Sequence, residues 1–330
     1  MTVNGVGNVA QYICFDIGGT SVKYGIVTGK GKVLAKGSFP TIDDSEKIVA
    51  DMVQVVNDLR NPGPVLGIGV AAPGLIKTDG YMVLGGSIQS FDGFPLGERL
   101  HDATGLPVAI ENDGNAAVIA EHWIGAARGI DNYVMVVLGT GVGGGIVING
   151  QLYRGAHGLA GEFDWSIIHN VELTAPLEDQ SVNQNVAVVD GLVRKYNESN
   201  QQVAPNEPEV TDPRTIMALA ESGDAIAAPI MASYYQDAAI LIINLFAYID
   251  PELILIGGGI SADKRFIREL LRHVDEYLTR HESMNEVKDF ALGRVKVAQL
   301  RNDAGLIGAA YGIKNKLRAA SAQTVRKAAL

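Results

Sequence analysis

Two stretches of the chain share one pattern of apolar and small residues. The first runs from Tyr12 to Gly29 and the second from Val134 to Gly150. Each reads as an apolar strand, a turn of glycine and threonine, and a second apolar strand that ends in another turn. The second stretch ends in Asn-Gly, a dipeptide typical of a hairpin turn. Because a pattern repeated far along a chain indicates a duplicated unit, we predict two lobes of related topology.

The remaining hydrophobic pattern predicts strands that alternate with helices, which is typical of an α/β protein. In the first half we expect strands at 33–39, 65–71 and 108–110 and helices at 45–59 and 115–127. In the second half we expect helices at 213–222, 225–248, 264–280 and 304–317 and strands at 253–256 and 295–298. The polar segment 171–206 predicts one short helix near 186–196 plus loops, and the tail after Ala319 is expected to be frayed.

Composition narrows the class of protein. A length of 330 residues suggests two domains, and 47% hydrophobic with 19% charged residues indicates a folded chain with a sizeable core. The longest apolar stretch, 238–249, contains Asn244 and predicts a buried helix rather than a membrane span. No secretory signal pattern is present at the N-terminus, so we expect a cytoplasmic protein.

Charge and cysteine content exclude further classes. The formal net charge of −10 argues against a broad nucleic-acid surface, which is usually basic. Cys14 is the only cysteine, so an internal disulfide is impossible and a cysteine-based metal site is not expected.

The first glycine turn is a candidate phosphate site. Gly18 and Gly19 let the backbone N–H groups approach a phosphate closely, and Thr20 adds a hydroxyl donor. Asp16 stands where a carboxylate could hold Mg²⁺ directly or through water. The alternative is an ordinary tight hairpin in which Asp16 bonds local amides.

A second glycine turn matches the pattern G-x-G-x-x-G at 139–144. A dinucleotide fingerprint needs a helix next, but Ile146-Val147-Ile148 continue as a strand, so a second phosphate-binding hairpin is favoured. Its candidate phosphate contacts are Gly139, Thr140, Gly141 and Gly143. Gly257, Gly258 and Gly259 follow a buried strand and could accommodate a flat adenine or ribose; the alternative is a plain strand-to-helix connection.

Two carboxylates are candidates for chemistry on a hydroxyl group. Asp113 stands where a strand ends and a helix begins, which suits a base that orients an attacking hydroxyl; the alternative is a helix N-cap. Glu162, among small residues, could accept hydrogen bonds from two sugar hydroxyls, or it could be a surface residue. His157 and His169 lack other suitably spaced metal ligands, so hydrogen-bonding roles are favoured.

Five motifs in order resemble those of the ROK family of sugar kinases and sugar-responsive repressors, within the actin, Hsp70 and hexokinase superfamily. The resemblance covers Ile13 to Tyr311. The motifs are DIGGT at 16–20 with Lys23 following, ENDGNAA at 111–117, LGTGVGGGIVING at 138–150, GAHGLAGE at 155–162 and LILIGGGIS at 253–261.

The resemblance implies an α/β fold of two RNase H-like (actin-like ATPase) lobes with a central cleft. The N-terminal lobe would be 1–117, with the C-terminal helix 303–330 packed back on it, and the C-terminal lobe 118–302. The reaction implied is Mg²⁺-dependent transfer of the ATP γ-phosphoryl group to the 6-hydroxyl of a hexose, in a protein that is often a homodimer. The residues implied are Asp113 as base; Asn112, Glu162, Gly74 and His157 at the sugar; the two glycine hairpins, with Lys23, at the ATP phosphates; and Gly257–Gly259 near the adenosine.

Three positions depart from the family pattern. Many members have Gly-His where this chain has Asp164-Trp165, and many carry a cluster of zinc-binding cysteines that is missing from this sequence. We therefore expect no zinc, and Trp165 either stacks on a sugar face or fills the space that zinc would have stabilised. Ser87 is the nearest match to an asparagine that often contacts the sugar.

Two other functions stay open at this stage. A sugar-sensing regulator of this family would carry an N-terminal helix-turn-helix, for which the residues before Asp16 leave no room. A pseudokinase would bind sugar without turnover, and the presence of Asp113 argues against it. The sequence does not distinguish glucose, a β-glucoside, fructose, mannose and N-acetylmannosamine.

Overall fold

The chain forms two compact units in a computed structural model that describes residues 9–60, 65–169 and 174–328. Unit 1 comprises Met1–Arg128, Gly155–Leu159 and Asn302–Leu330. Unit 2 comprises Gly129–Arg154 and Ala160–Arg301. Each unit contains one five-stranded sheet.

The sheet of unit 1 has the order β3-β2-β1-β4-β7. Its strands are β1 (Gln11–Ile17), β2 (Ser21–Thr28), β3 (Val33–Pro40), β4 (Val65–Ala72) and β7 (Val108–Asn112). The first three strands are antiparallel neighbours, whereas β4 and β7 run parallel to β1. A small hairpin, β5 (Leu75–Ile76) and β6 (Met82–Leu84), follows β4.

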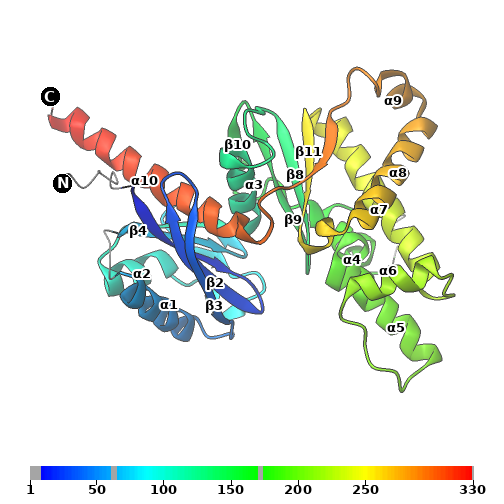
Figure 1. The fold of residues 1–330 in the computed structure, drawn as a ribbon, viewed down its shortest axis with the longest axis horizontal. Helices are drawn as coiled ribbons and strands as arrows, with labels where there is room; N and C mark the ends of the chain where they lie inside the picture. The colour runs from blue at the N-terminus through cyan, green and yellow to red at the C-terminus, as the bar shows by residue number, and fades with distance from the viewer. Residues whose placement is uncertain (1–8, 61–64, 170–173, 329–330) are drawn as a thin grey trace, which may run out of the picture. The chain divides into compact units, whose positions relative to one another are not determined.

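Alternate residues of β1 supply two different cores. Ile13, Phe15 and Ile17 pack with helices α1 (Ser45–Leu59) and α2 (Leu96–Thr104) on one face of the sheet. Tyr12 and Cys14 pack on the other face with α3 (Asp113–Ile124) and α10 (Ala304–Ala328). Figure 1 shows helix α10 lying against the sheet. Burial raises the pKa of the Cys14 thiol, which is a core side chain without a disulfide partner.

Helix α10 approaches its neighbours at positions that have no side chain. A Cβ added at Gly308 would lie 2.0 Å from the carbonyl oxygen of Ala116 in α3. A Cβ added at Gly69 in β4 would lie 2.2 Å from the carbonyl oxygen of Ala309. Glycine is therefore required at both positions for the backbones to pack this closely.

The sheet of unit 2 repeats the order and directions of the first, as β10-β9-β8-β11-β12. Its strands are β8 (Tyr133–Leu138), β9 (Val142–Ile148), β10 (Gln151–Tyr153), β11 (Leu253–Gly257) and β12 (Arg294–Val297). The hairpin predicted at Asn149-Gly150 is confirmed, and both residues have positive φ angles of 52° and 71°.

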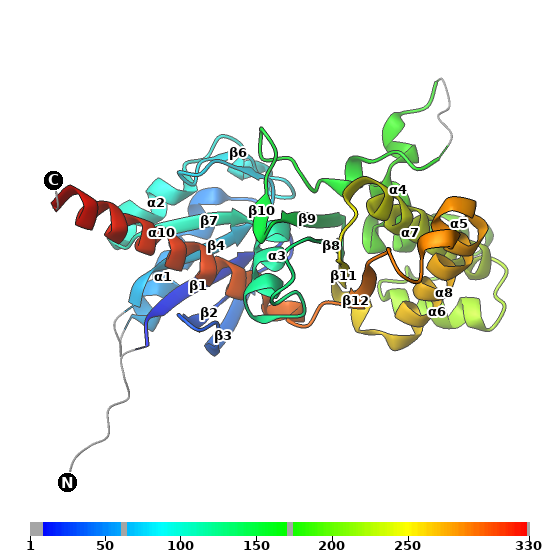
Figure 2. The same ribbon diagram turned by 90° about the horizontal axis from the view of Figure 1, so that it is seen from above.

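Helix α7 (Ala227–Ile249) is the central helix of unit 2. It lies among α4 (Val182–Val186), α5 (Arg194–Val203), α6 (Pro213–Glu221) and α8 (Lys264–Arg280), as Figure 2 shows. Within the described residues it is the one helix long and apolar enough to cross a membrane, but 56% of its apolar window is buried inside the protein. Its role here is that of a core helix.

Three sequence predictions need correction. The segment expected to hold one short helix near 186–196 contains α4, a π-helix η4 (Val188–Val193) and α5, which continues η4 to Val203; Ala187, between α4 and η4, is extended. Residues 170–173 lie outside the described part. The wider π-helical turn shifts the side-chain register, so the α-helical period is lost. Helix α2 was missed because it is short, although Gly105 with φ 68° closes it. The tail expected to fray after Ala319 is helical to Ala328, in an alanine-rich stretch.

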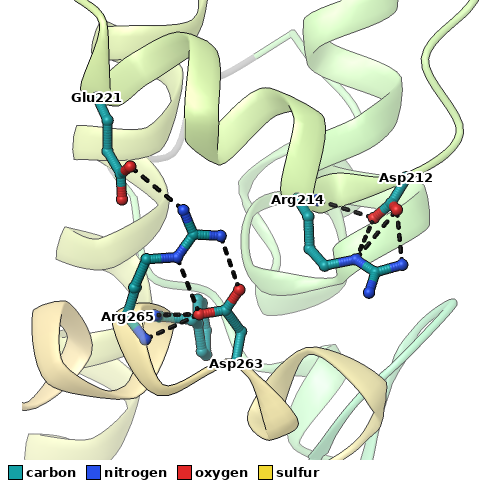
Figure 3. Close-up of polar contacts among 6 residues, drawn as sticks. Asp212, Arg214, Glu221, Asp263 and Arg265 are labelled. Atoms are coloured by element: carbon teal, nitrogen blue, oxygen red, sulfur yellow. Dashed lines mark hydrogen bonds and ion pairs between the residues drawn. The ribbon is translucent and has the colours of Figure 1, made fainter.

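One exposed ion pair, between Arg265 and Glu221, joins α8 to α6 at the surface of unit 2 (Figure 3). The Asp263 carboxylate accepts hydrogen bonds from the backbone N–H groups of Arg265 and Phe266, so it caps α8. The Arg265 guanidinium lies 3.0 Å from Asp263 Oδ2 and 3.4 Å from Glu221 Oε2. Because such exposed pairs contribute little stability, the cap is the feature that determines where α8 begins.

The glycine contacts of α10 give a matched pair of predictions. We expect Gly308→Ala to lower the free energy of unfolding by about 1–3 kcal/mol, because its methyl group would overlap the backbone of α3. We expect Gly312→Ala on the same helix to be neutral or to raise it by about 0.4–1 kcal/mol, since the nearest atom to its Cβ is 4.0 Å away. Urea denaturation measures both; equal effects of the two variants would contradict the packing argument.

Candidate active site

The first glycine turn connects β1 to β2 and is held from the side of β3. Gly18 N donates to Ser21 O at 3.1 Å, and Thr41 Oγ1 donates to Gly18 O at 2.6 Å. Thr41 N also donates to Thr20 O at 3.1 Å. Gly19 and Thr20 remain exposed, so the outer edge of a well-fixed turn is open to a ligand.

Asp16 is enclosed by its own strand pair and by helix α10. Lys23 lies directly opposite on β2, and its Nζ is 3.2 Å from Asp16 Oδ2. A Cβ added at Gly305 would lie 2.5–2.8 Å from the carboxylate atoms of Asp16, so the first turn of α10 lies against this carboxylate. A helix N-terminus favours a negative charge there. Lys23, predicted as an ATP contact, binds Asp16 in this structure.

Asn112, and not Asp113, caps helix α3. Asn112 Oδ1 accepts from Asn115 N at 3.0 Å, and its Nδ2 donates to Gly74 O at 3.1 Å. The Asp113 carboxylate accepts one hydrogen bond from a described residue, the N–H of Gly114 at 2.8 Å. The capping role that sequence left open for Asp113 therefore belongs to its neighbour, which leaves the Asp113 carboxylate available for a ligand.

The Asp113 carboxyl group has an unusual environment. Protein atoms packed around it hinder its hydration and raise its pKa to about 6. The N–H of Gly114 opposes this rise, and the negative charge of Asp16 adds to it. The side chain nevertheless stays exposed to solvent, so protein surrounds it on some sides and leaves another side accessible. A carboxyl group with this pKa is mostly ionised at neutral pH and can accept a proton.

Strand register brings the unit 1 candidates to one edge of the sheet. Asp16 on β1 lies beside Ala71 on β4, which lies beside Glu111 on β7. Asp16 and Asp113 are therefore both at the carboxyl ends of parallel strands, where ligands bind in α/β sheets.

Gly74 and Ser87 lie at the same end of unit 1. A Cβ added at Gly74, whose φ is 89°, would be 2.0 Å from the carbonyl oxygen of Leu84, so only glycine fits. A Cβ added at Gly19 would lie 3.4 Å from Ser87 Oγ. Ser87 is thus next to the first glycine turn, a neighbour that sequence did not predict.

The second glycine turn, in unit 2, is held by the π-helix η4. The carbonyl oxygen of Gly139 accepts from the N–H groups of Val188 and Val189 at 2.9 and 3.3 Å, and that of Thr140 accepts from Asp190 N at 3.1 Å. A Cβ added at Gly143 would meet no atom within 4 Å, so open space adjoins the turn.

The glycines after β11 lie against the start of the second turn. A Cβ added at Gly258, whose φ is 88°, would be 1.9 Å from the carbonyl oxygen of Leu138, the last residue of β8. Ser261 Oγ donates to Gly258 O at 2.7 Å and fixes the bend. Gly257, at the end of β11, is buried, whereas Gly259 is exposed with no atom near its Cβ position. Unit 2 thus brings the predicted adenosine and phosphate contacts together.

The segment with Glu162 is seated on the glycines of β9. A Cβ added at Gly161, whose φ is 98°, would be 2.9 Å from Gly145 Cα, and the Phe163 ring lies over Gly144. Glu162 is partly exposed between these contacts and begins the short 3₁₀-helix η2 (Phe163–Trp165).

The other residues of this region are placed as follows. Trp165 is 60% exposed, so its ring does not fill an interior space. Burial raises the pKa of Asp164, whose Oδ1 has no partner among the described residues. His157 is exposed and belongs to unit 1. His169 Nε2 lies 3.2 Å from Asp237 Oδ2, in line with the hydrogen-bonding role predicted for it.

Three residues that shape the site were missed by sequence reasoning. Thr41 holds the first turn, and Gly305 allows the backbone of α10 to lie against Asp16. Asn183 lies beside Gly141, and its Oδ1 has no hydrogen-bond partner among the described residues. Glycines three and seven residues beyond Gly305 give one face of the last helix a run of small residues, a signal for close packing. Thr41 and Asn183 have no comparable signal.

Comparisons with known proteins agree on one family. The family model described as ROK family matches residues 12–316. A beta-glucoside kinase from Listeria monocytogenes is 35% identical over 299 residues, which are 90% of this chain and 95% of that protein.

Solved structures agree in fold with this chain. The Lmo2764 protein from Listeria monocytogenes, described as a candidate N-acetylmannosamine kinase, is 32% identical with a TM-score of 0.80, covering 93% of this chain and 99% of that one. A glucokinase from Streptomyces griseus in complex with glucose and AMPPNP is 26% identical with a TM-score of 0.75, covering 92% and 98%. The predicted actin-like fold is thereby confirmed, and the chain belongs to the ROK family.

Proposed function

We propose that this protein is an ATP-dependent kinase that phosphorylates a hexose or hexose derivative at its 6-hydroxyl group. The observation that carries the proposal is the state of Asp113: its carboxylate is not a helix cap, is accessible, and has a pKa of about 6. The beta-glucoside kinase and glucokinases among its relatives support the same reaction class.

The two glycine turns bind the phosphates of ATP in this proposal. Backbone N–H groups of Gly19 and Thr20 and of Thr140 and Gly141 donate to phosphate oxygens, whereas those of Gly18 and Gly139 close the two turns, and the bend at Gly257–Gly259 accommodates the adenosine. Phosphoryl transfer depends mainly on such positioning and on electrostatic stabilisation of the transferred group. We infer that units 1 and 2 are the two lobes that supply one turn each; the lobe boundaries at 117 and 302 remain a prediction.

A magnesium ion fits the donors of unit 1. Mg²⁺ in kinases is held largely by phosphate oxygens and water, so one or two protein oxygens suffice. Asp16, with Thr20 near it at the end of the hairpin, provides this donor set; within the described residues no group of three or more His, Cys, Asp or Glu side chains offers another. When bound, the ion would neutralise charge on the β- and γ-phosphates.

Asp113 acts as the general base in the transfer step. Its carboxylate accepts the proton of the C6 hydroxyl while the C6 oxygen attacks the γ-phosphorus and the bond to the ADP oxygen breaks. Asn112 holds Asp113 in place by capping α3 and by binding Gly74, and one amide hydrogen remains for a sugar hydroxyl. Glu162 is proposed to accept hydrogen bonds from further sugar hydroxyls, with Ser87 and His157 completing the predicted set.

Trp165 points to the substrate class. An exposed aromatic ring three residues after Glu162 suits stacking on a second sugar ring or on an aglycone, because a buried packing role would have hidden it. We therefore propose a β-glucoside as the substrate, as the name of the 35% identical relative suggests. Structural zinc is not expected, and a homodimer in the cytoplasm stays a prediction.

The two alternatives have less support. A sugar-sensing regulator would not require a carboxylate poised as a base. A pseudokinase would not need Asp113 to be held accessible by a neighbouring cap.

Asp113→Asn tests the base directly. We expect the turnover number for hexose phosphorylation to fall by a factor of about 10²–10⁴, since the amide cannot accept the proton but keeps the size of the side chain. ATP affinity, measured by calorimetry, is expected to stay unchanged. Asp102→Asn, an exposed acid in α2 of the same unit, is the matched control. Near-normal turnover of the Asp113 variant would remove it from the base role.

The pH dependence of kcat/KM follows from the raised pKa of Asp113. Only the ionised carboxylate accepts a proton, so activity is expected to be full above pH 7 and to fall through pH about 6 by about tenfold per pH unit below it. A coupled assay of ADP release at constant ionic strength measures the profile. A midpoint near 4, the ordinary aspartate value, would contradict the environment described for this carboxyl group.

Trp165→Ala tests the substrate class. We expect kcat/KM for the β-linked disaccharide cellobiose to fall about threefold to tenfold through loss of stacking, while kcat/KM for glucose changes less than about twofold. Tyr248→Ala, at the 77% exposed tyrosine near the end of α7, is the control for removal of a surface aromatic ring. Equal losses on both sugars, or no loss on either, would refute the stacking role without affecting the kinase assignment.

A further inference from the structure

Two segments that follow Trp165, residues 166–169 and 179–182, are paired in unit 2 and form a stem. Val182 N donates to Ser166 O at 2.8 Å, and Ile168 N donates to Gln180 O at 3.0 Å. A β-bridge between Ile167 and Ser181 completes this stem. The stem directly follows η2 and holds its Trp165 end, while Gly161 and Phe163 seat the Glu162 end on β9; both attachments together fix this segment.

One strand of the stem is bound to a buried carboxylate. Asp237, in the middle of α7, is fully buried, and its Oδ2 lies 3.2 Å from His169 Nε2. Ser233 Oγ donates to the same oxygen at 3.4 Å. A buried carboxylate is costly unless it is paired, so a carboxylate at this position depends on His169 from the stem. Burial raises the pKa of Asp237, and His169 and Lys195 oppose that rise.

The other strand of the stem is bound by a second polar group. Asn185, only 6% exposed in α4, donates from Nδ2 to Ser181 O at 2.7 Å and to Asp179 O at 3.2 Å. Lys195 Nζ in turn donates to Asn185 Oδ1 at 2.5 Å and so orients the amide. Each half of the stem is therefore attached to a different core helix by a buried side chain.

The two attachments are linked through Lys195. Lys195 interacts with the charge of Asp237 as well as with Asn185. Burial lowers the pKa of Lys195, and the charge of Asp237 acts against that fall. A cation and a carboxylate that stabilise each other away from water form one unit, in which loss of one member weakens the others.

We infer that His169, Asp237, Asn185 and Lys195 form a polar clamp that positions the segment carrying Glu162 and Trp165. This clamp rests on the proposed function only in the assignment of those two residues to sugar binding. The four residues are positioning residues: they hold the stem to α4, α5 and α7 and do not contact the reacting atoms.

His169→Ala tests the clamp with a measurement that needs no substrate. We expect backbone amides of the stem, Ile168 and Val182 among them, to exchange hydrogen for deuterium about tenfold faster in the full-length protein, because the stem opens locally more often. Amides of β8 and α8 in the same unit are expected to be unaffected. Glu276→Gln, which breaks the exposed Arg272–Glu276 pair in α8, is the matched control.

The kinetic signature distinguishes positioning from general damage. In His169→Ala the KM for the sugar is expected to rise about tenfold with the KM for ATP within about twofold. His169→Gln, which retains an N–H donor, is expected to recover part of the loss. The His169 variants are used in place of a change at Asp237, because the His169 side chain is partly exposed whereas Asp237 is buried in the core.

Two results would overturn the clamp. One is unchanged exchange of the stem amides in His169→Ala, and the other is an equal rise in both KM values. If the protein phosphorylated no sugar, the exchange result would still stand, so failure of the clamp and failure of the proposed function are distinguishable.

Discussion

The carboxylate of Asp16 lies against the backbone of helix α10 with no side chain between them, and much of unit 1 depends on that contact. The first strand of the chain supplies the carboxylate and its last helix supplies Gly305, so this contact brings together segments from near the two ends of the sequence. Lys23 pairs with Asp16 on one side, and the charge of Asp16 helps to raise the pKa of Asp113 on another. One small residue thus links packing to the acid–base chemistry of the site.

The two units have related sheets, but different residues hold the glycine turn in each. Both have the same sheet order and a glycine turn between the first two antiparallel strands. In unit 1 the turn is held by Thr41, whereas in unit 2 it is held by N–H groups of a π-helix. π-Helical turns are rare, and they often occur at functional sites. The duplicated scaffold has been retained, while the contacts that fix each turn are specific to each unit.

Sequence reasoning succeeded where local pattern and local chemistry agree. The helix at 45–59 and the helix at 264–280 were predicted with the observed bounds, because each has a strongly amphipathic pattern and an aspartate cap. It failed where the determinant is a contact between distant segments. The sequence around Gly305 does not predict its contact with Asp16, and the sequence around His169 does not predict its contact with the buried Asp237. The candidate site residues were named from motifs, but the cap at Asn112 and the exposure of Trp165 required the structure.

The central claim is that this chain transfers a phosphoryl group from ATP to the 6-hydroxyl of a hexose unit. The most direct measurement is phosphorus–proton correlation NMR on the product formed from ATP, Mg²⁺ and a glucoside. We expect a new phosphomonoester signal coupled to the two protons on carbon 6, formed together with ADP. A phosphate coupled to the anomeric proton, or ADP without any phosphorylated sugar, would contradict the central claim.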